Sequence, residues 1–158
     1  MLSRPVFTKF FTLQLALLLA LGISSAALAA GSSSYSTAPS KPAGYDAVLR
    51  LIKDKKFAEA IPALHMIEAR AKTDADVQNL LGFSYRKTNQ LDKAGRHYER
   101  ALALDPKHKG ALEYQGELFL MLKDRAAAEA NLEKLKKICR IGCSELNDLK
   151  DALEKYQG

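Results

Sequence analysis

The chain has 158 residues, of which 47% are hydrophobic and 27% charged, and its formal net charge is +6. This length suits one domain with a modest core, and two cysteines are too few for a disulfide-dense scaffold. Basic residues 53, 55 and 56 are interrupted by Asp54, and no aromatic platform is interleaved with them. These features argue against a nucleic-acid-binding surface.

The N-terminus has the pattern of a secretory signal peptide. Arg4 and Lys9 precede an apolar run over residues 10–23, and residues 27–29 read Ala-Leu-Ala, the form of a cleavage site. The run is shorter than the roughly 20 residues that span a membrane. We expect residues 1–29 to be removed and the mature chain to be periplasmic, with an uncleaved membrane anchor as the alternative. No cysteine lies near the cleavage point, which excludes lipid attachment there.

Residues 30–43 are rich in Ser, Pro and Gly and have few apolar groups to bury. This composition predicts a flexible linker before the first helix.

The clearest pattern in the chain spans residues 75–106 and predicts two antiparallel helices. Thr88, Asn89 and Gln90 separate two apolar series with helical spacing. The series consist of Val77, Leu80, Leu81 and Tyr85, followed by Leu91, Ala94, Tyr98, Ala101 and Leu102. Small residues, Gly82 on the first helix and Ala94 on the second, stand where the helices would approach closest.

This stretch resembles a tetratricopeptide repeat. The residues that carry the resemblance are Leu81, Gly82, Tyr85, Ala94, Tyr98, Ala101 and Pro106, with Gln78 at the position of the usual Trp. Neighbouring repeats are expected at 34-residue steps, because one helix pair cannot bury its apolar face alone. The residues 34 positions before and after Tyr85 are Leu51 and Phe119, and those 34 positions before and after Ala94 are Ala60 and Ala128.

The resemblance therefore implies an all-α fold of three antiparallel helix-pair repeats, in residues 44–73, 75–106 and 107–141, stacked as a right-handed α-solenoid. Asp105 is expected to cap the helix that opens the third repeat, with Pro106 in its first turn. The third repeat departs from the pattern at Gln115, where Leu is expected.

A final amphipathic helix is predicted over residues 144–157, with Ser144 as its N-cap. Its apolar stripe consists of Leu146, Leu149, Leu153 and Tyr156. Such a helix would cover the open end of the third repeat, as solenoid caps do.

Cys139 and Cys143 flank a predicted turn at Gly142. A chain that reverses at a glycine brings residues four apart within reach of a disulfide, and export provides an oxidising compartment. We therefore favour a structural disulfide. The alternative is a redox dithiol, although the spacing is C-x-x-x-C and not the C-x-x-C of thioredoxin-like motifs.

The resemblance also implies a binding surface, because the first helix of each pair lines the concave side in this family. The partner-binding candidates are Tyr45 and Leu49, then Asn79, Phe83 and Arg86, then Glu113, Glu117 and Leu120. We expect Arg86 to face outward and Leu120 to be exposed; Phe83 is either exposed or packed against the next repeat. The Lys/Asn set with which chaperone-binding members grip a C-terminal carboxylate is missing, so that ligand is not expected.

No catalytic or metal-binding constellation stands out. His65, His97 and His108 share no helix at ligand spacing and are expected on the surface. We predict a protein that is not an enzyme, has no cofactor and binds no nucleic acid, and that has no membrane span after signal cleavage. The predicted function is an exported module that binds a protein or peptide of the cell envelope. Self-association is left open, and a thiol-disulfide redox protein is the alternative.

Overall fold

The computed structural model describes residues 41–71 and 73–158. The predicted signal peptide and all but the last three residues of the predicted linker lie outside the described residues. Every regular element described is a helix, and their bounds are α1 Tyr45–Lys53, α2 Phe57–Glu68, α3 Ala75–Lys87, α4 Leu91–Leu104, α5 Lys109–Met121, α6 Arg125–Ile138 and α7 Ser144–Lys155. The predicted all-α class, with three helix pairs and a final helix, is confirmed.

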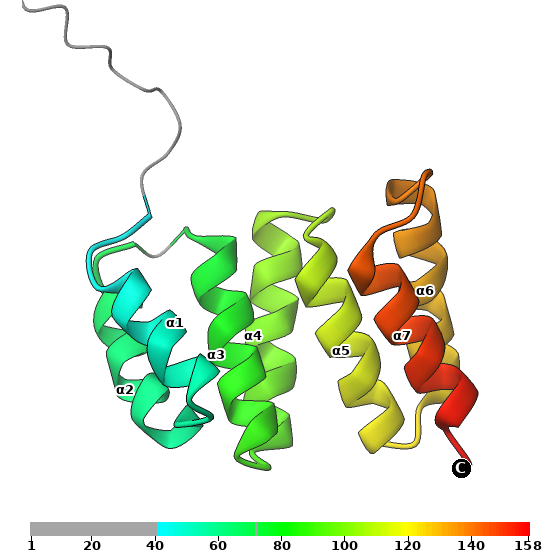
Figure 1. Cartoon of the computed structure of the whole chain (residues 1–158), viewed down its shortest axis with the longest axis horizontal. Coiled ribbons are helices and arrows are strands. Elements are labelled where there is room, and N and C mark those ends of the chain that lie inside the picture. Colours follow the sequence, from blue (N-terminus) through cyan, green and yellow to red (C-terminus); the bar gives the residue numbers. More distant parts are fainter. Residues whose placement is uncertain (1–40, 72) are drawn as a thin grey trace, which may run out of the picture. The chain divides into compact units, whose positions relative to one another are not determined.

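The helices form two layers (Figure 1), with α1, α3, α5 and α7 in front of α2, α4 and α6. Each helix packs on its neighbours in chain order, and α5 also contacts α3 and α7. We call the surface formed by the first layer the odd-helix face.

The turn inside each pair is built the same way at 34-residue intervals. Lys55, Asn89 and Lys123 all have positive φ, between 59° and 63°. In each turn the next N–H donates to a carbonyl five residues back at 2.8 Å, as Gln90 does to Tyr85. A left-handed residue with this hydrogen bond closes a helix end, so the periodicity of the sequence is also a periodicity of the backbone.

Two predicted helix starts were wrong. Asp105 does not cap the helix of the third repeat, because α5 begins at Lys109 and the ring of His108 accepts the capping hydrogen bond from the Ala111 N–H at 3.1 Å. Asp105 accepts from the Lys107 N–H at 2.9 Å within the preceding turn. Ser144 is the first residue of α7, and Cys143 occupies the N-cap position.

The first core cluster joins the first two helix pairs, with Leu118 of α5 at its edge. Gly82 of α3 faces the fully buried ring of Tyr98 so closely that a Cβ at Gly82 would lie 2.6 Å from two ring atoms. The predicted close approach at Gly82 is confirmed, and Ala94 has no exposed area.

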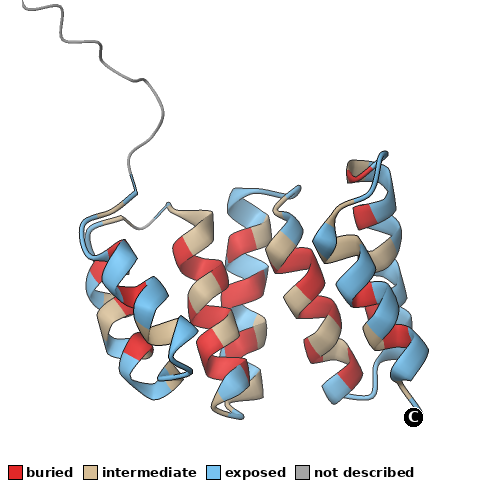
Figure 2. Cartoon of the chain, in the orientation of Figure 1, coloured by how far each residue is buried: buried red, intermediate tan, exposed pale blue. Residues whose placement is uncertain are grey.

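The second core cluster joins α5, α6 and α7, and Figure 2 shows buried residues along α5 where these helices meet. Gly116 of α5 lies against Leu149 of α7. A Cβ at Gly116 would lie only 2.6 Å from the nearest side-chain atom of Leu149. The unexpected Gln115 is buried and accepts a hydrogen bond from the Asn131 amide at 2.9 Å. Helix α7 therefore docks on α5 at the place where the next repeat would begin.

Cys139 and Cys143 link the end of α6 to the start of α7. Their Cα atoms are 5.7 Å apart and the two sulfur atoms are at bonding distance. Cys139 is buried against the second core cluster, whereas Cys143 is partly exposed.

Candidate functional site: a cleft at the ends of three parallel helices

A cleft opens on the odd-helix face where α3, α5 and α7 reach their C-terminal ends. Its volume is about 390 Å³. Its lining residues are Arg86, Lys87, Glu117, Leu120, Met121, Ala152, Lys155 and Tyr156. Among its lining residues Leu120 and Arg86 are buried, whereas Met121, Lys87 and Lys155 are exposed, so the cleft combines apolar side chains with charged groups.

Arg86 is the central charged group of this region, and the prediction that it faces outward was wrong. Its side chain is only 7% exposed and pairs with the Glu117 carboxylate. The guanidinium also lies over two aromatic rings, 5.7 Å from the Phe83 centroid and 5.6 Å from that of Tyr114. A cation held over ring faces and neutralised by a carboxylate is fixed in position, so Arg86 links α3 to α5.

Phe83 lies between the first and third repeats, as one of the two predicted alternatives stated. Its ring is 5.6 Å from that of Phe57 and 4.8 Å from that of Tyr114. Aromatic pairs at these distances stabilise packing. The expectation that Leu120 is an exposed apolar group was wrong, because only 8% of it is exposed, although it lines the cleft.

Glu113 lies one turn before Glu117 on α5 and is only 6% exposed. Its pKa is raised to about 8, chiefly by burial and then by the negative charges of Glu117, Asp148 and Glu145, while Arg86 opposes the shift. We call Glu113, Glu117, Glu145 and Asp148 the acidic cluster. It joins the middle of α5 to the first two turns of α7.

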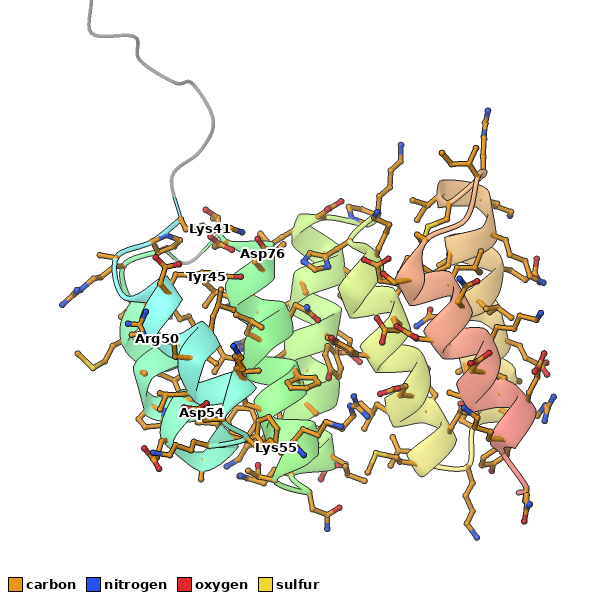
Figure 3. The ribbon with its side chains drawn as sticks, in the orientation of Figure 1. Lys41, Tyr45, Arg50, Asp54, Lys55 and Asp76 are labelled. Carbon is orange, nitrogen blue, oxygen red and sulfur yellow. A yellow bond between two sulfur atoms is a disulfide. The ribbon has the colours of Figure 1, made fainter. Side chains whose placement is uncertain are left out.

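The remaining predicted residues lie outside the cleft. Tyr45 is buried, with the Lys41 ammonium 4.8 Å from its ring centroid, and Lys41 also pairs with Asp76 of α3 (Figure 3). Leu49 is 41% exposed. Asn79 is buried with no hydrogen-bond partner for its Oδ1 within residues 41–71 and 73–158. The structure thus brings together Arg86, Glu117 and Leu120, with Phe83 and Glu113 beside them, but not Tyr45 or Leu49.

Ala152 and Lys155 of α7, and Tyr156 directly after it, line the cleft but are absent from the predicted set. The resemblance assigned binding to the first helices of three repeats and gave the final helix only a covering role. Since α7 stands where a fourth first helix would stand, its amphipathic pattern was the available signal.

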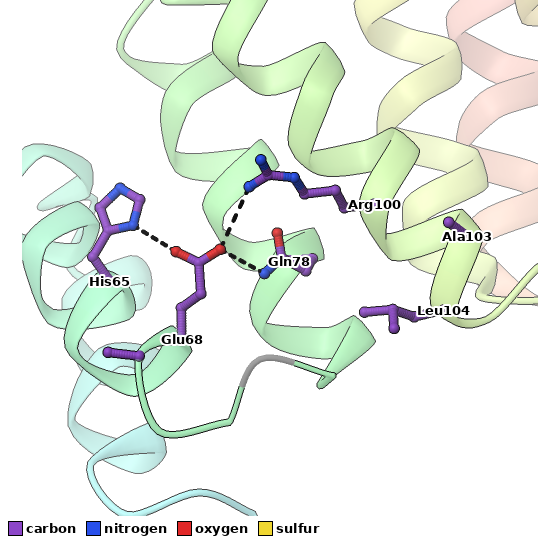
Figure 4. A pocket seen from close by; sticks show the side chains of 7 residues that line it. His65, Glu68, Gln78, Arg100, Ala103 and Leu104 are labelled. Atoms are coloured by element: carbon purple, nitrogen blue, oxygen red, sulfur yellow. Dashed lines mark hydrogen bonds and ion pairs between the residues drawn. The ribbon is translucent and has the colours of Figure 1, made fainter.

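A second cavity of about 470 Å³ lies between α2, α3 and α4 (Figure 4). Glu68 is its central group and accepts a hydrogen bond from the Gln78 amide at 2.8 Å. His65 is 2.8 Å from Glu68, and Arg100 is 3.6 Å from it. Gln78, at the position of the usual Trp, thereby joins α3 to α2 through a hydrogen bond.

The histidines are not all on the surface, contrary to expectation. His97 is 7% exposed and its Nδ1 lies 2.8 Å from the Gln78 side-chain oxygen. Burial lowers the pKa of His97 to about 4 against the opposing charge of Glu68. His108 is half-buried and lies 2.9 Å from Asp76, so both rings hold neighbouring helices together.

No group of three or more potential ligands for a metal ion occurs within the described residues. Among the described helices, none is both long enough and apolar enough to cross a membrane.

The comparisons with known proteins agree with this architecture. The tetratricopeptide repeat profile matches residues 75–108, and no curated protein sequence matches the chain. MamA from Desulfovibrio magneticus RS-1 is 28% identical over 64% of this chain and superposes with a TM-score of 0.59. The chain spans 57% of the length of that MamA structure.

Two more distant structures show the same fold. The type III secretion translocator chaperone SycD of Yersinia enterocolitica is 19% identical, with a TM-score of 0.62 over 71% of this chain and 84% of that one. The first repeat domain of Spaghetti (RPAP3), solved with the HSP90 peptide SRMEEVD, is 16% identical, with a TM-score of 0.61 over 69% and 86% of the two chains. The chain therefore contains a tetratricopeptide repeat at residues 75–108, and its described helices have the fold of tetratricopeptide repeat structures.

Proposed function

We propose that this chain is an exported interaction module that binds a segment of another cell-envelope protein on its odd-helix face. The observation that carries the proposal is the cleft between α3, α5 and α7, where the apolar side chains of Leu120 and Met121 lie beside the exposed Lys87 and Lys155. Exposed apolar groups beside ordered charged groups are typical of protein-binding surfaces. The RPAP3 likeness supports peptide binding by this fold in general.

Site-specific photocrosslinking in cells tests the binding surface. A photoreactive residue at Met121, which lies in the cleft, should capture a defined partner. The same residue at Met66 of α2, which is 64% exposed, should not capture it. The captured protein should then bind the purified chain with lower affinity when Tyr156 is replaced by alanine. Equal capture at the two positions, or none at Met121, would refute the proposed surface.

Export is the second part of the proposal and rests on the charged start, apolar run and Ala-Leu-Ala segment of the N-terminus. Mass spectrometry of the native protein should find Ala30 as the first residue, in the periplasmic fraction. An intact N-terminus in the membrane fraction would instead support the anchor.

We further propose that Cys139 and Cys143 form a structural disulfide in the native protein. Burial of Cys139 against the second core cluster suits a staple better than an exchanging dithiol, which needs an accessible thiolate.

A further inference from the structure

We propose that the cleft at the ends of α3, α5 and α7 binds a partner segment in which two acidic side chains flank an apolar one. The apolar side chain lies against Leu120 and Met121, and the two carboxylates pair with Lys87 and Lys155. This inference rests on the proposed function and names the chemistry of the partner at the same cleft.

The first observation is the apolar surface at the cleft. Met121 is 47% exposed, and the adjacent Leu122 is 50% exposed. Leu120 and Tyr156 line the same cavity, whose volume of about 390 Å³ falls in the range of ligand pockets. A partner that covers these exposed groups removes apolar surface from water, so an apolar side chain seated here contributes to binding.

The second observation is the charge of the lining residues. Arg86, Lys87 and Lys155 are cationic, and Glu117 is the one acidic side chain among the described residues that line the cleft. Arg86 and Glu117 neutralise each other in their ion pair, which leaves the positive charges of the two lysines. An excess of positive charge is complementary to an acidic partner segment.

Both lysines are available to a partner. Lys87 is exposed, and its ammonium lies 5.3 Å from the ring centroid of Phe83, with no carboxylate paired to it among the described residues. Lys155 lies 3.9 Å from the Asp151 carboxylate in an exposed pair, which contributes little to stability. Each lysine also stands in the last turn of its helix, where it faces the helix dipole. An incoming carboxylate can therefore pair with either ammonium without breaking a strong ion pair.

The positions of the lysines favour two acidic side chains over one terminal carboxylate. Helix α5 packs against both α3 and α7 and lies between them (Figure 1). Axes of packed helices are about 8–10 Å apart, so the ends that carry Lys87 and Lys155 are roughly 16–20 Å apart. In an extended segment the side chains at the first, third and fifth positions share one face and span about 13 Å. Such a segment directs one acid toward each lysine, with the apolar side chain between them.

The acidic cluster lies away from the cleft and does not cancel this charge. From Asp148, its member nearest to Lys155 along α7, the helix rises about 10 Å to Lys155, which is about one Debye length at physiological salt. Glu113 is mostly protonated at neutral pH, because burial and nearby carboxylates raise its pKa to about 8.

The test is an NMR titration of the full mature chain, with the backbone amides of the cleft residues as readout. The probe is the peptide acetyl-Glu-Ser-Leu-Ser-Glu-amide, and its neutral counterpart is acetyl-Gln-Ser-Leu-Ser-Gln-amide. A third peptide, acetyl-Gln-Ser-Leu-Ser-Gln with a free C-terminal carboxylate, tests the terminal group. The acidic peptide should bind saturably and about ten-fold more tightly than the other two, and added salt should reduce that difference.

Matched variants assign the preference to the lysines. Lys87→Gln combined with Lys155→Gln should weaken binding of the acidic peptide about ten-fold. Lys136→Gln, an exposed site on α6, should leave binding unchanged. Because all three side chains are exposed, amide signals outside the cleft should keep their positions and show that the fold is intact.

Three results would overturn the inference directly: equal binding of the acidic and neutral peptides, no saturable binding of the acidic peptide at millimolar concentration, or unchanged binding by the double variant. Equally tight binding of the peptide with the free carboxylate would overturn it in favour of a terminal carboxylate. Shifts of the same amides on dilution of the chain alone would overturn it in favour of a second copy.

The outcome is separable from that of the proposed function. A preference for the acidic peptide without any partner captured at Met121 would refute the proposed function alone. Capture at Met121 without that preference would refute this inference alone.

Discussion

At residue 82 helix α3 has no side chain, and the Tyr98 ring fills the space. Gly82→Ala would place a Cβ 2.6 Å from ring atoms of a side chain with no exposed area. We expect it to lower the free energy of unfolding by about 1–3 kcal/mol, because overpacking a rigid core contact displaces both groups. Urea unfolding measures the change.

Gly95 of α4 provides the control. A Cβ there meets only Leu118, at an ordinary 3.7 Å. Gly95→Ala should stabilise the protein by roughly 0.5–1 kcal/mol through helix propensity. If both substitutions changed the free energy of unfolding in the same direction, the packing described at Gly82 would be incorrect.

Arg86→Ala should destabilise the chain, in contrast to what an outward-facing residue would predict. It removes the partner of Glu117 and the cation over two rings. We expect a loss of roughly 1–3 kcal/mol, because a largely buried carboxylate keeps its charge without compensation. Arg125→Ala, which breaks the exposed pair with Glu129, should change stability by at most about 0.5 kcal/mol. Similar urea midpoints for the two variants would refute the central role of Arg86.

At the scale of elements, two interactions attach α7 to the rest of the domain. They are the packing of Leu149 against Gly116 and the link between Cys139 and Cys143. Replacing both cysteines by serine should lower stability by about 2 kcal/mol at most, the loop-closure value for so short a ring. Thermal melts of the two proteins, with alkylation of the native protein under mild reductant, measure this effect. Fast-reacting thiols combined with an unchanged melt would support the redox alternative instead.

At the scale of the whole molecule, two buried groups set opposite pH dependences. His97 has a pKa of about 4, so between pH 6.5 and 4 the unfolded chain binds a proton that the folded chain does not, and acid destabilises the fold. Glu113 has a pKa of about 8, so between pH 4.5 and 8 the folded chain holds the extra proton, and stability falls as pH rises.

Single substitutions should separate these two effects in urea unfolding between pH 4.5 and 8.5. Glu113→Gln should remove most of the loss between pH 6.5 and 8, and His97→Gln most of the loss below pH 6.5. Curves for both variants that run parallel to that of the unsubstituted protein would contradict both assignments.

The sequence predicted the repeats well because helical spacing and small residues such as Gly82 and Ala94 report local packing. It predicted the site less well because exposure depends on neighbours in other repeats. The helical spacing within a single helix predicted that Arg86 and Leu120 face outward, yet neighbouring helices cover both side chains. The contribution of Tyr156 could be seen only once α7 was placed beside α5.

Because contacts join helices that are next to or two apart in chain order, the described domain should open progressively from its ends and not all at once. Native-state hydrogen exchange measures the free energy of each local opening. Amides of α3 and α4, which have neighbours on both sides, should exchange slowest and those of α1 fastest. The proposed Cys139–Cys143 disulfide should make amides at the C-terminal end exchange more slowly than those at the N-terminal end, and its reduction should remove that difference. Such short-range topology also predicts folding within microseconds to milliseconds.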